Sequence, residues 1–298
     1  MAHEALIRLA TFFGIFLLMA SWESLAPLRP LTTSRPRRWL ANLALSVLDT
    51  LLVRAVLPTA AVGVAMAATE RGWGLLNLLG WPGWMLVPLA VVALDLVVYL
   101  QHVLFHALPL LWRFHMVHHS DLDVDVTTGV RFHPIEILAS AAIKVAAVAL
   151  LGAPALAVLV FEALLNATSM FNHSNVRMPR GVERILRWIV VTPDMHRIHH
   201  SADRRETDSN FGFNLPWWDR LLGTYRLHPF RGQQGLTLGL EQFREPGRLT
   251  LPRILALPFA GARKGPPGDR RGEGQRAQPE APGDVEALPR PAAGPAAR

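Results

Sequence analysis

The sequence has no cysteine, and lysine occurs only at Lys144 and Lys264. The lack of cysteine excludes disulfides, thiolate metal sites and cysteine nucleophiles, so any metal must be bound through nitrogen or oxygen. The formal net charge of +7 therefore comes almost wholly from arginine. Outside the C-terminal tail no dense basic patch alternates with aromatic residues, so an anionic membrane surface is a better partner than nucleic acid.

Several catalytic signatures are also absent. The chain has no G-x-G-x-x-G dinucleotide fingerprint and no H-E-x-x-H zinc-peptidase motif. It also lacks the Glu-x-x-His pairs of soluble di-iron proteins. With no cysteine to hold an iron–sulfur cluster, redox chemistry in this chain needs electrons from a separate donor.

Apolar residues are abundant, at 51% of the chain with a mean hydropathy of +0.24. Long apolar runs cover residues 5–22, 39–68, 84–108 and 135–171. About 20 apolar residues suffice to cross the hydrocarbon of a bilayer as a helix. The sequence therefore predicts an all-α integral membrane protein with four to five transmembrane or re-entrant helices and a helical cap on the cytoplasmic side.

Breaks and charges inside these runs predict the topology. Residues 152–154 (Gly-Ala-Pro) divide the last run into two halves and favour a hairpin, while Pro58 is expected to kink the second run. Arg35, Arg37 and Arg38 mark the loop after the first run as cytoplasmic. Trp81, Trp84 and Trp112 flank the run 84–108 and are expected at the headgroup levels.

The same pattern divides the chain into four parts. Residues 1–83 are expected to hold the N-terminal spans and loops, and residues 84–230 the catalytic domain with its membrane hairpin. Residues 231–260 are expected to form a peripheral segment. From 261 to 298 the chain is rich in Pro, Gly, Ala and Arg, which is typical of a disordered tail that catalysis does not need.

Histidine carries the chemistry of the middle of the chain. Ten of the twelve histidines lie between positions 102 and 200, and eight of those form three boxes: His102 and His106; His115, His118 and His119; and His196, His199 and His200. Spacings of three and four place imidazoles on one face of a helix, where they can share a metal. Neutral imidazole binds iron, copper, zinc or nickel, so the boxes predict a metal site without choosing the metal.

Single residues near the boxes are expected to assist them. His173 and His133 lie at the two ends of the predicted hairpin; His173 is expected to be a ligand, and His133 either a ligand or a partner of one. Asp95, Tyr99, His102 and His106 form one helical stripe. Asp95 or Tyr99 is expected to orient an imidazole by a hydrogen bond; the alternative is an aspartate facing a water-filled crevice. His3 and His228 fall outside the cluster.

The ordered boxes resemble those of the fatty acid hydroxylase and sterol desaturase superfamily. The resemblance covers roughly residues 85–228. It includes D-x3-Y-x2-H-x3-H from Asp95, R-F-H-P-I-E from Arg131, N-H-S-N from Asn172, T-P-D-M-H from Thr192, and N-F-G-F-N with W-W-D-R-L-L-G-T-Y from Asn210. Fatty-acid 2-hydroxylases of this family tend to have a histidine where this chain has Ser169, so the sterol-desaturase-like branch is the closer match.

This resemblance implies a membrane-bound non-haem di-iron enzyme with dioxygen as co-substrate. The implied iron ligands are His102, His106, His115, His118, His119, His173, His196, His199 and His200, and no catalytic residue is expected beyond the metal centre. The implied reaction is hydroxylation or desaturation of a sterol-like, fatty acyl, carotenoid or ether lipid with electrons from an external cytochrome, ferredoxin or reductase. The alternative is a histidine-rich membrane protein that binds or transports metal without oxidase activity, although carriers usually place ligands near the bilayer midplane.

Overall fold

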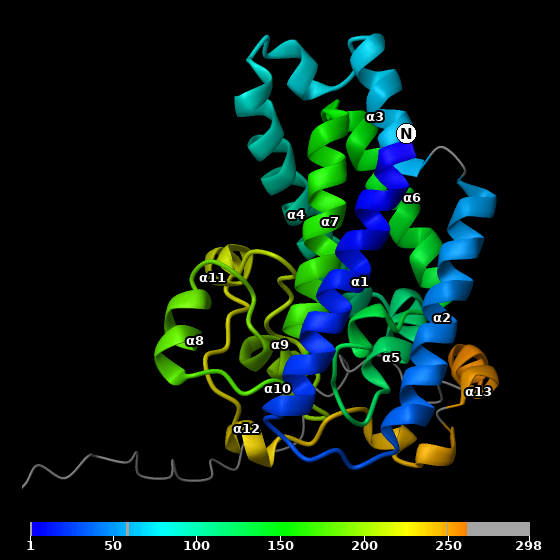
Figure 1. The fold of residues 1–298 in the computed structure, drawn as a ribbon, viewed down its shortest axis with the longest axis vertical. Coiled ribbons are helices and arrows are strands. Elements are labelled where there is room, and N and C mark those ends of the chain that lie inside the picture. The colour runs from blue at the N-terminus through cyan, green and yellow to red at the C-terminus, as the bar shows by residue number, and fades with distance from the viewer. Residues whose placement is uncertain (1, 58–59, 249, 261–298) are drawn as a thin grey trace, which may run out of the picture.

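The computed structural model describes residues 2–57, 60–248 and 250–260 (Figure 1). In those residues the regular structure is helical, and pairing between extended segments is limited to two isolated bridges, Pro27 with Val176 and Ser201 with Leu238. The predicted all-α class is therefore confirmed. The predicted tail over residues 261–298 lies outside the described residues.

Five helical segments are long and apolar enough to cross a membrane. The first lies in α1 (Ala2–Leu25), and the second, residues 35–78, contains α2 (Arg35–Val56), α3 (Ala60–Glu70) and η1 (Leu75–Leu78). The others are α4 (Gly83–Ala107), α6 (Pro134–Leu151) and α7 (Ala155–Asn172). The predicted single run over 39–68 is thus divided between α2 and α3, and the kink expected at Pro58 falls on residues outside the described part.

The hairpin of α6 and α7 follows from its local sequence. At the start of α6, the His133 side chain accepts a hydrogen bond from the Ile135 backbone, and Pro134 occupies the first turn, where a missing N–H costs nothing. At its end, Gly152 adopts φ of 63°, the left-handed conformation that glycine enters without steric cost. The hairpin predicted from the break at 152–154 is confirmed.

Packing among the spans relies on small residues. Helix α7 packs against α1, α3 and α4, and α6 packs against α2, α3 and α4. Their shared interior contains Ala90, Ala147, Ala157, Val158 and Phe161. Small side chains let helices approach closely, which is how helices associate inside a bilayer.

The remaining helices gather at the end of the bundle where α1, α4 and α7 finish (Figure 1). This cap contains α5 (Pro109–His119), η2 (Thr128–Val130), α8 (Arg180–Leu186), α9 (Pro193–His199), α10 (Arg204–Thr207), α11 (Trp217–Leu222), α12 (Gly232–Gly235), η3 (Glu241–Phe243), η4 (Pro246–Arg248), α13 (Leu251–Ala256) and η5 (Leu257–Phe259). All three histidine boxes lie at this end of the molecule.

Candidate metal centre

All nine predicted histidine ligands come together in two buried groups. The first group contains His102, His106, His115, His119 and His199, and the second contains His118, His173, His196 and His200. Within each group the potential ligand atoms lie within 4.8 Å of one another. Each group could therefore hold one metal ion with nitrogen ligands alone.

The two groups are built from four helices. The last turns of α4 supply His102 and His106, α5 and α9 carry the two H-x-x-H-H boxes, and His173 is the C-cap residue of α7. Neighbouring histidines in each box go to different groups: His119 and His199 to the first, His118 and His200 to the second. The ring centroids of His119 and His200 are only 4.6 Å apart, so the groups adjoin.

Nitrogen–nitrogen distances inside the groups suit shared coordination. His102 Nε2 lies 3.1 Å from His115 Nε2, and His173 Nε2 lies 3.0 Å from the Nε2 atoms of both His118 and His196. If metal–imidazole bonds are about 2.1 Å, as for zinc, two ligands at a right angle are about 3 Å apart. The paired nitrogens therefore have the spacing of two ligands on one ion.

The opposite ring nitrogen of most histidines is held by the protein. Nδ1 of His102, His118, His173 and His199 lies 2.6–3.1 Å from the backbone carbonyls of Phe211, Arg131, Ser169 and Ser209 respectively. A neutral imidazole that donates through Nδ1 presents Nε2 as an acceptor. These carbonyls thus select the tautomer that metal binding requires.

In the first group, two carboxylates contact Nδ1 of a histidine in place of a backbone carbonyl. Glu136 Oε1 lies 2.6 Å from His115 Nδ1, and Asp208 Oδ1 lies 3.3 Å from His106 Nδ1. Sequence reasoning did not assign a role to either residue. Glu136 carries a readable signal, since it closes the R-F-H-P-I-E segment one helical turn after His133; Asp208 carries none.

Several buried imidazole nitrogens have no hydrogen-bond partner among the described residues. They are His119 Nδ1, His196 Nδ1, His199 Nε2 and both ring nitrogens of His200. A buried polar atom without a partner is costly, and metal ions would satisfy His199 Nε2 and one ring nitrogen of His200. The donor set therefore fits a metal centre.

Burial also keeps these side chains uncharged. It lowers the pKa of His115 to about 3 and that of His173 to about 4. Burial, followed by repulsion from neighbouring histidines, holds the pKa of His118 and His200 well below the usual value. Neutral imidazole is the form that binds metal.

His133 lies outside both groups. Its Nδ1 accepts the hydrogen bond from the Ile135 backbone, and its Nε2 lies 3.3 Å from the Leu255 carbonyl. Both ring nitrogens are therefore engaged. The structure favours neither of the roles expected from the sequence and makes His133 the N-cap of α6.

Asp95 and Tyr99 also differ from expectation. Asp95 Oδ2 accepts hydrogen bonds from Trp218 Nε1 at 2.8 Å and from the Leu215 backbone at 3.3 Å, and the Tyr99 hydroxyl bonds Thr224 Oγ1 at 2.7 Å. The expected direct bond to an imidazole is not made. Both residues instead hold the segment 211–224 against α4.

The segment 211–224 links Asp95 and Tyr99 to the metal centre. The Asp219 carboxylate accepts hydrogen bonds from the backbone of Phe211 and Gly212 and from the Thr224 hydroxyl. The Phe211 carbonyl in turn lies 2.7 Å from His102 Nδ1. Asp95 and Tyr99 therefore act on His102 only through the position of the loop.

Aromatic rings enclose the histidines. Trp112 is buried and packs on His106 and His119, at centroid distances of 4.9 and 5.3 Å. Trp112 therefore contacts the histidines rather than an exposed surface, and its expected position at the headgroup level stays a prediction. The rings of Phe211 and Phe213 pack against His102, at centroid distances of 5.5 and 5.1 Å.

A buried ion-pair network fixes the loop after the second box. Arg38 of α2 pairs with Asp121 and Asp125 through contacts of 2.7 Å. Arg131 donates to the Val117 carbonyl, and its own carbonyl faces His118. Although burial raises the pKa of Asp121, the neighbouring Arg38 and Arg131 guanidiniums lower it overall. The charged network therefore stays ionised and sets the orientation of His118.

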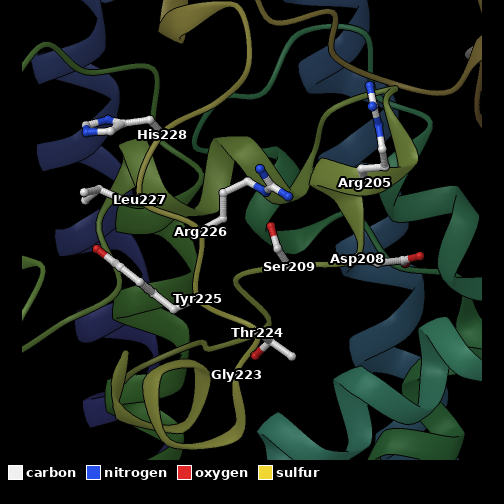
Figure 2. A pocket seen from close by; sticks show the side chains of 9 residues that line it. All are labelled: Arg205, Asp208, Ser209, Gly223, Thr224, Tyr225, Arg226, Leu227 and His228. Carbon is white, nitrogen blue, oxygen red and sulfur yellow. The ribbon is translucent and has the colours of Figure 1, made fainter. Parts of the chain in front are cut away.

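A pocket of about 430 Å³ is lined by residues that contact the first group (Figure 2). Its lining includes Asp208 and Ser209, the partners of His106 and His199, together with Arg205, Arg226 and His228. The lining is mostly polar, so the pocket suits water or a polar group better than an acyl chain. His228, set aside on sequence grounds, lines this pocket.

Residues 87–224, which contain the three boxes, the hairpin and the loop above, match the fatty acid hydroxylase family. The predicted resemblance to the fatty acid hydroxylase and sterol desaturase superfamily is confirmed over this part of the chain.

Curated relatives resemble about half of this chain. Ornithine lipid hydroxylase OlsE of Rhizobium tropici is 38% identical over 50% of this chain and 44% of its own length. Alkylglycerol monooxygenase of Homo sapiens is 27% identical over 56% of this chain and 36% of its own. Cholesterol 25-hydroxylase of Rattus norvegicus is 29% identical over 48% and 47%. The match thus spans less than half the length of each relative. No solved structure gives a significant match.

Proposed function

We propose that the chain is a membrane-bound di-iron oxygenase that hydroxylates or desaturates a lipid. The observation that carries this proposal is the pair of adjoining, fully buried histidine groups at the ends of membrane-spanning helices. Three curated relatives are named for the hydroxylation or monooxygenation of lipids. Two ferrous ions held there would activate dioxygen, which is the oxidant, for removal of hydrogen from an unactivated C–H bond, with electrons from the external donor.

The chain's own residues have defined tasks in this proposal. The nine histidines hold the ions, and backbone carbonyls at Arg131, Ser169, Ser209 and Phe211 orient four of the rings. Glu136 and Asp208 orient two more. Trp112, Phe211 and Phe213 exclude water from the rings they cover. Electrons come from an external donor, and no role for nucleic acid is proposed.

We further propose that the metal centre faces the cytoplasm. The cap end carries exposed Arg37, Arg180 and Arg184, whereas the turns at the far end carry Arg71 and, at Gly152 to Pro154, no basic residue. Arginine in short loops favours the cytoplasmic side. Arg38, which sequence reasoning counted with this loop, is neutralised by Asp121 and Asp125, so the orientation rests on the other arginines. The proposed catalytic domain is residues 84–230, between the N-terminal spans and the peripheral segment 231–260.

Metal and lipid analysis together test the proposal. The purified protein is expected to contain two iron ions per chain without a haem Soret band. Lipid extracts of cells that express it are expected to contain species changed in mass by one added oxygen or two lost hydrogens. Bound zinc with unchanged lipids, or iron uptake into vesicles without lipid oxidation, would instead support the metal-binding or transport alternative.

A further inference from the structure

Helices α8 and α11 present apolar side chains that the rest of the chain leaves uncovered. Ile185 is 65% exposed and Leu221 is 72% exposed. The other large exposed residues of this α8–α11 surface are Val182, Trp188, Ile189, Trp217 and Leu222. A patch of this kind marks an interaction surface, because single scattered apolar residues do not gather in this way.

Specific contacts hold the two helices together as one surface. Trp217 Nε1 donates to the Trp188 carbonyl at 2.8 Å, and Arg220 donates to the Arg187 carbonyl at 3.0 Å. The Arg220 guanidinium also lies 3.9 Å from the centroid of the Trp188 ring. The exposed apolar residues therefore sit on a fixed arrangement.

This surface is attached to two of the candidate membrane spans. Trp218 in α11 and the Leu215 backbone just before α11 donate hydrogen bonds to Asp95 in α4. Asn214 bonds Thr168 in α7. In Figure 1, α8 and α11 project sideways beside the lower ends of α4 and α7. The surface thus lies beside the middle of α4 and the C-terminal part of α7.

The charges around the surface are basic. Arg177, Arg180 and Arg184 are exposed, while Glu183, the one acidic residue between positions 176 and 190, is buried against Arg187. Apolar and tryptophan side chains bordered by arginines are typical of segments that lie in the interface of an anionic bilayer.

We propose that the α8–α11 surface lies in the headgroup layer of the bilayer. Its apolar side chains enter the boundary between headgroups and acyl chains, and Arg180 and Arg184 contact anionic lipid phosphates. Because α9 follows α8 within a few residues, this contact also fixes the depth of the third histidine box relative to the membrane. The inference stands apart from the reaction that the metal centre performs.

The absence of cysteine makes the test direct. Single variants Ile185→Cys and Leu221→Cys, each carrying a nitroxide label, are placed in vesicles of phosphatidylcholine and phosphatidylglycerol. Both labels are expected to collide more with oxygen than with a water-soluble nickel chelate. Glu241→Cys, at an exposed site of the cap, is the control and should show the opposite order.

Two outcomes would overturn the proposal. In the first, the labels at 185 and 221 collide with the nickel chelate as often as the label at 241 does. The other is protection from both reagents with dipolar broadening, which would show that a second copy covers the surface. To test the headgroup contact, Arg180→Glu with Arg184→Glu should move the label at 185 toward water only when phosphatidylglycerol is present; an unchanged label would remove that part of the proposal.

Discussion

At the scale of single residues, the metal centre depends on which histidines have a free ring nitrogen. Nine of them point a nitrogen into one of two groups, whereas His133 has both nitrogens engaged by the backbone. Chemically identical side chains in one stretch of sequence therefore serve different purposes. This difference gives the first prediction its control.

Removal of one ligand from each group should abolish metal-dependent activity. His118→Ala and His199→Ala are each expected to lower bound iron and eliminate lipid oxidation, while the protein remains in the membrane because the spans are untouched. His133→Ala should keep its iron and lose only about 1 kcal/mol of stability as a helix cap. Iron content per chain in membranes decides this, and normal turnover in either ligand variant would contradict the metal centre.

Asp95 should act on function through the loop that it holds. Asp95→Leu removes the acceptor for Trp218 and the Leu215 backbone, so the carbonyl of Phe211 is expected to lose its position beside His102. Iron retention or activity should fall by about 10–100-fold, the usual effect of a residue that supports a ligand.

Asp95→Asn keeps one acceptor oxygen and should lose less than Asp95→Leu. Membrane insertion should be intact in both variants, since an apolar residue suits the span at least as well. Iron content and lipid oxidation at normal levels in Asp95→Leu would show that the loop holds its place without this contact.

At the scale of elements, the α6–α7 hairpin places Glu136 and His173 at the same end of the bundle. The left-handed turn at Gly152 closes the hairpin at the other end. A Cβ at Gly152 would lie 2.3 Å from the Trp73 carbonyl. The turn therefore requires glycine both for its backbone angle and for its close packing.

Gly152→Ala should destabilise the protein by more than the strain of about 1–3 kcal/mol at a positive φ, because its Cβ would also clash with the Trp73 carbonyl. Thermal unfolding in detergent measures this. Gly14→Ala, in the middle of α1 where a Cβ meets nothing within 4 Å, is the matched control. Alanine there should be neutral or stabilise by up to about 1 kcal/mol; equal melting temperatures for the two variants would show that the turn is not strained.

At the scale of the whole molecule, metal binding and stability should be coupled. An ion that binds the folded chain but not the unfolded one raises the melting temperature. Chelation should therefore lower the melting temperature of the native protein. The same treatment should leave the His118→Ala, His199→Ala double variant unchanged. If the chelator does not change the melting temperature of the native protein, the histidine groups do not hold metal.

Truncation after Ala260 should preserve lipid oxidation. Residues 261–298 contain too few apolar side chains to fold as a unit. Activity per bound iron in membranes, compared with the full chain, checks this. A truncated protein that binds iron but is inactive would mean that the tail recruits the electron donor.

The sequence by itself determined the helical membrane class, the break at Gly152 and the membership of each histidine in a box. These features depend on local properties, namely apolar run length, turn chemistry and helical spacing. Helical spacing could not predict how the histidines of one box divide between the two metal-binding groups. A helix places residues i, i+3 and i+4 on one face, and only the packing of α4, α5, α7 and α9 sent His118 and His119 to different groups.

Tertiary structure alone also decided the partners of the histidines. Arg131, Ser169, Ser209 and Phe211 serve through backbone carbonyls, which every residue possesses, so no residue type could reveal them. The position of Asp95 in an apolar run indicated that it needs a polar partner, but the sequence did not identify that partner. That choice was made by the loop carrying Trp218, which is 123 positions away along the chain and is brought to α4 by folding.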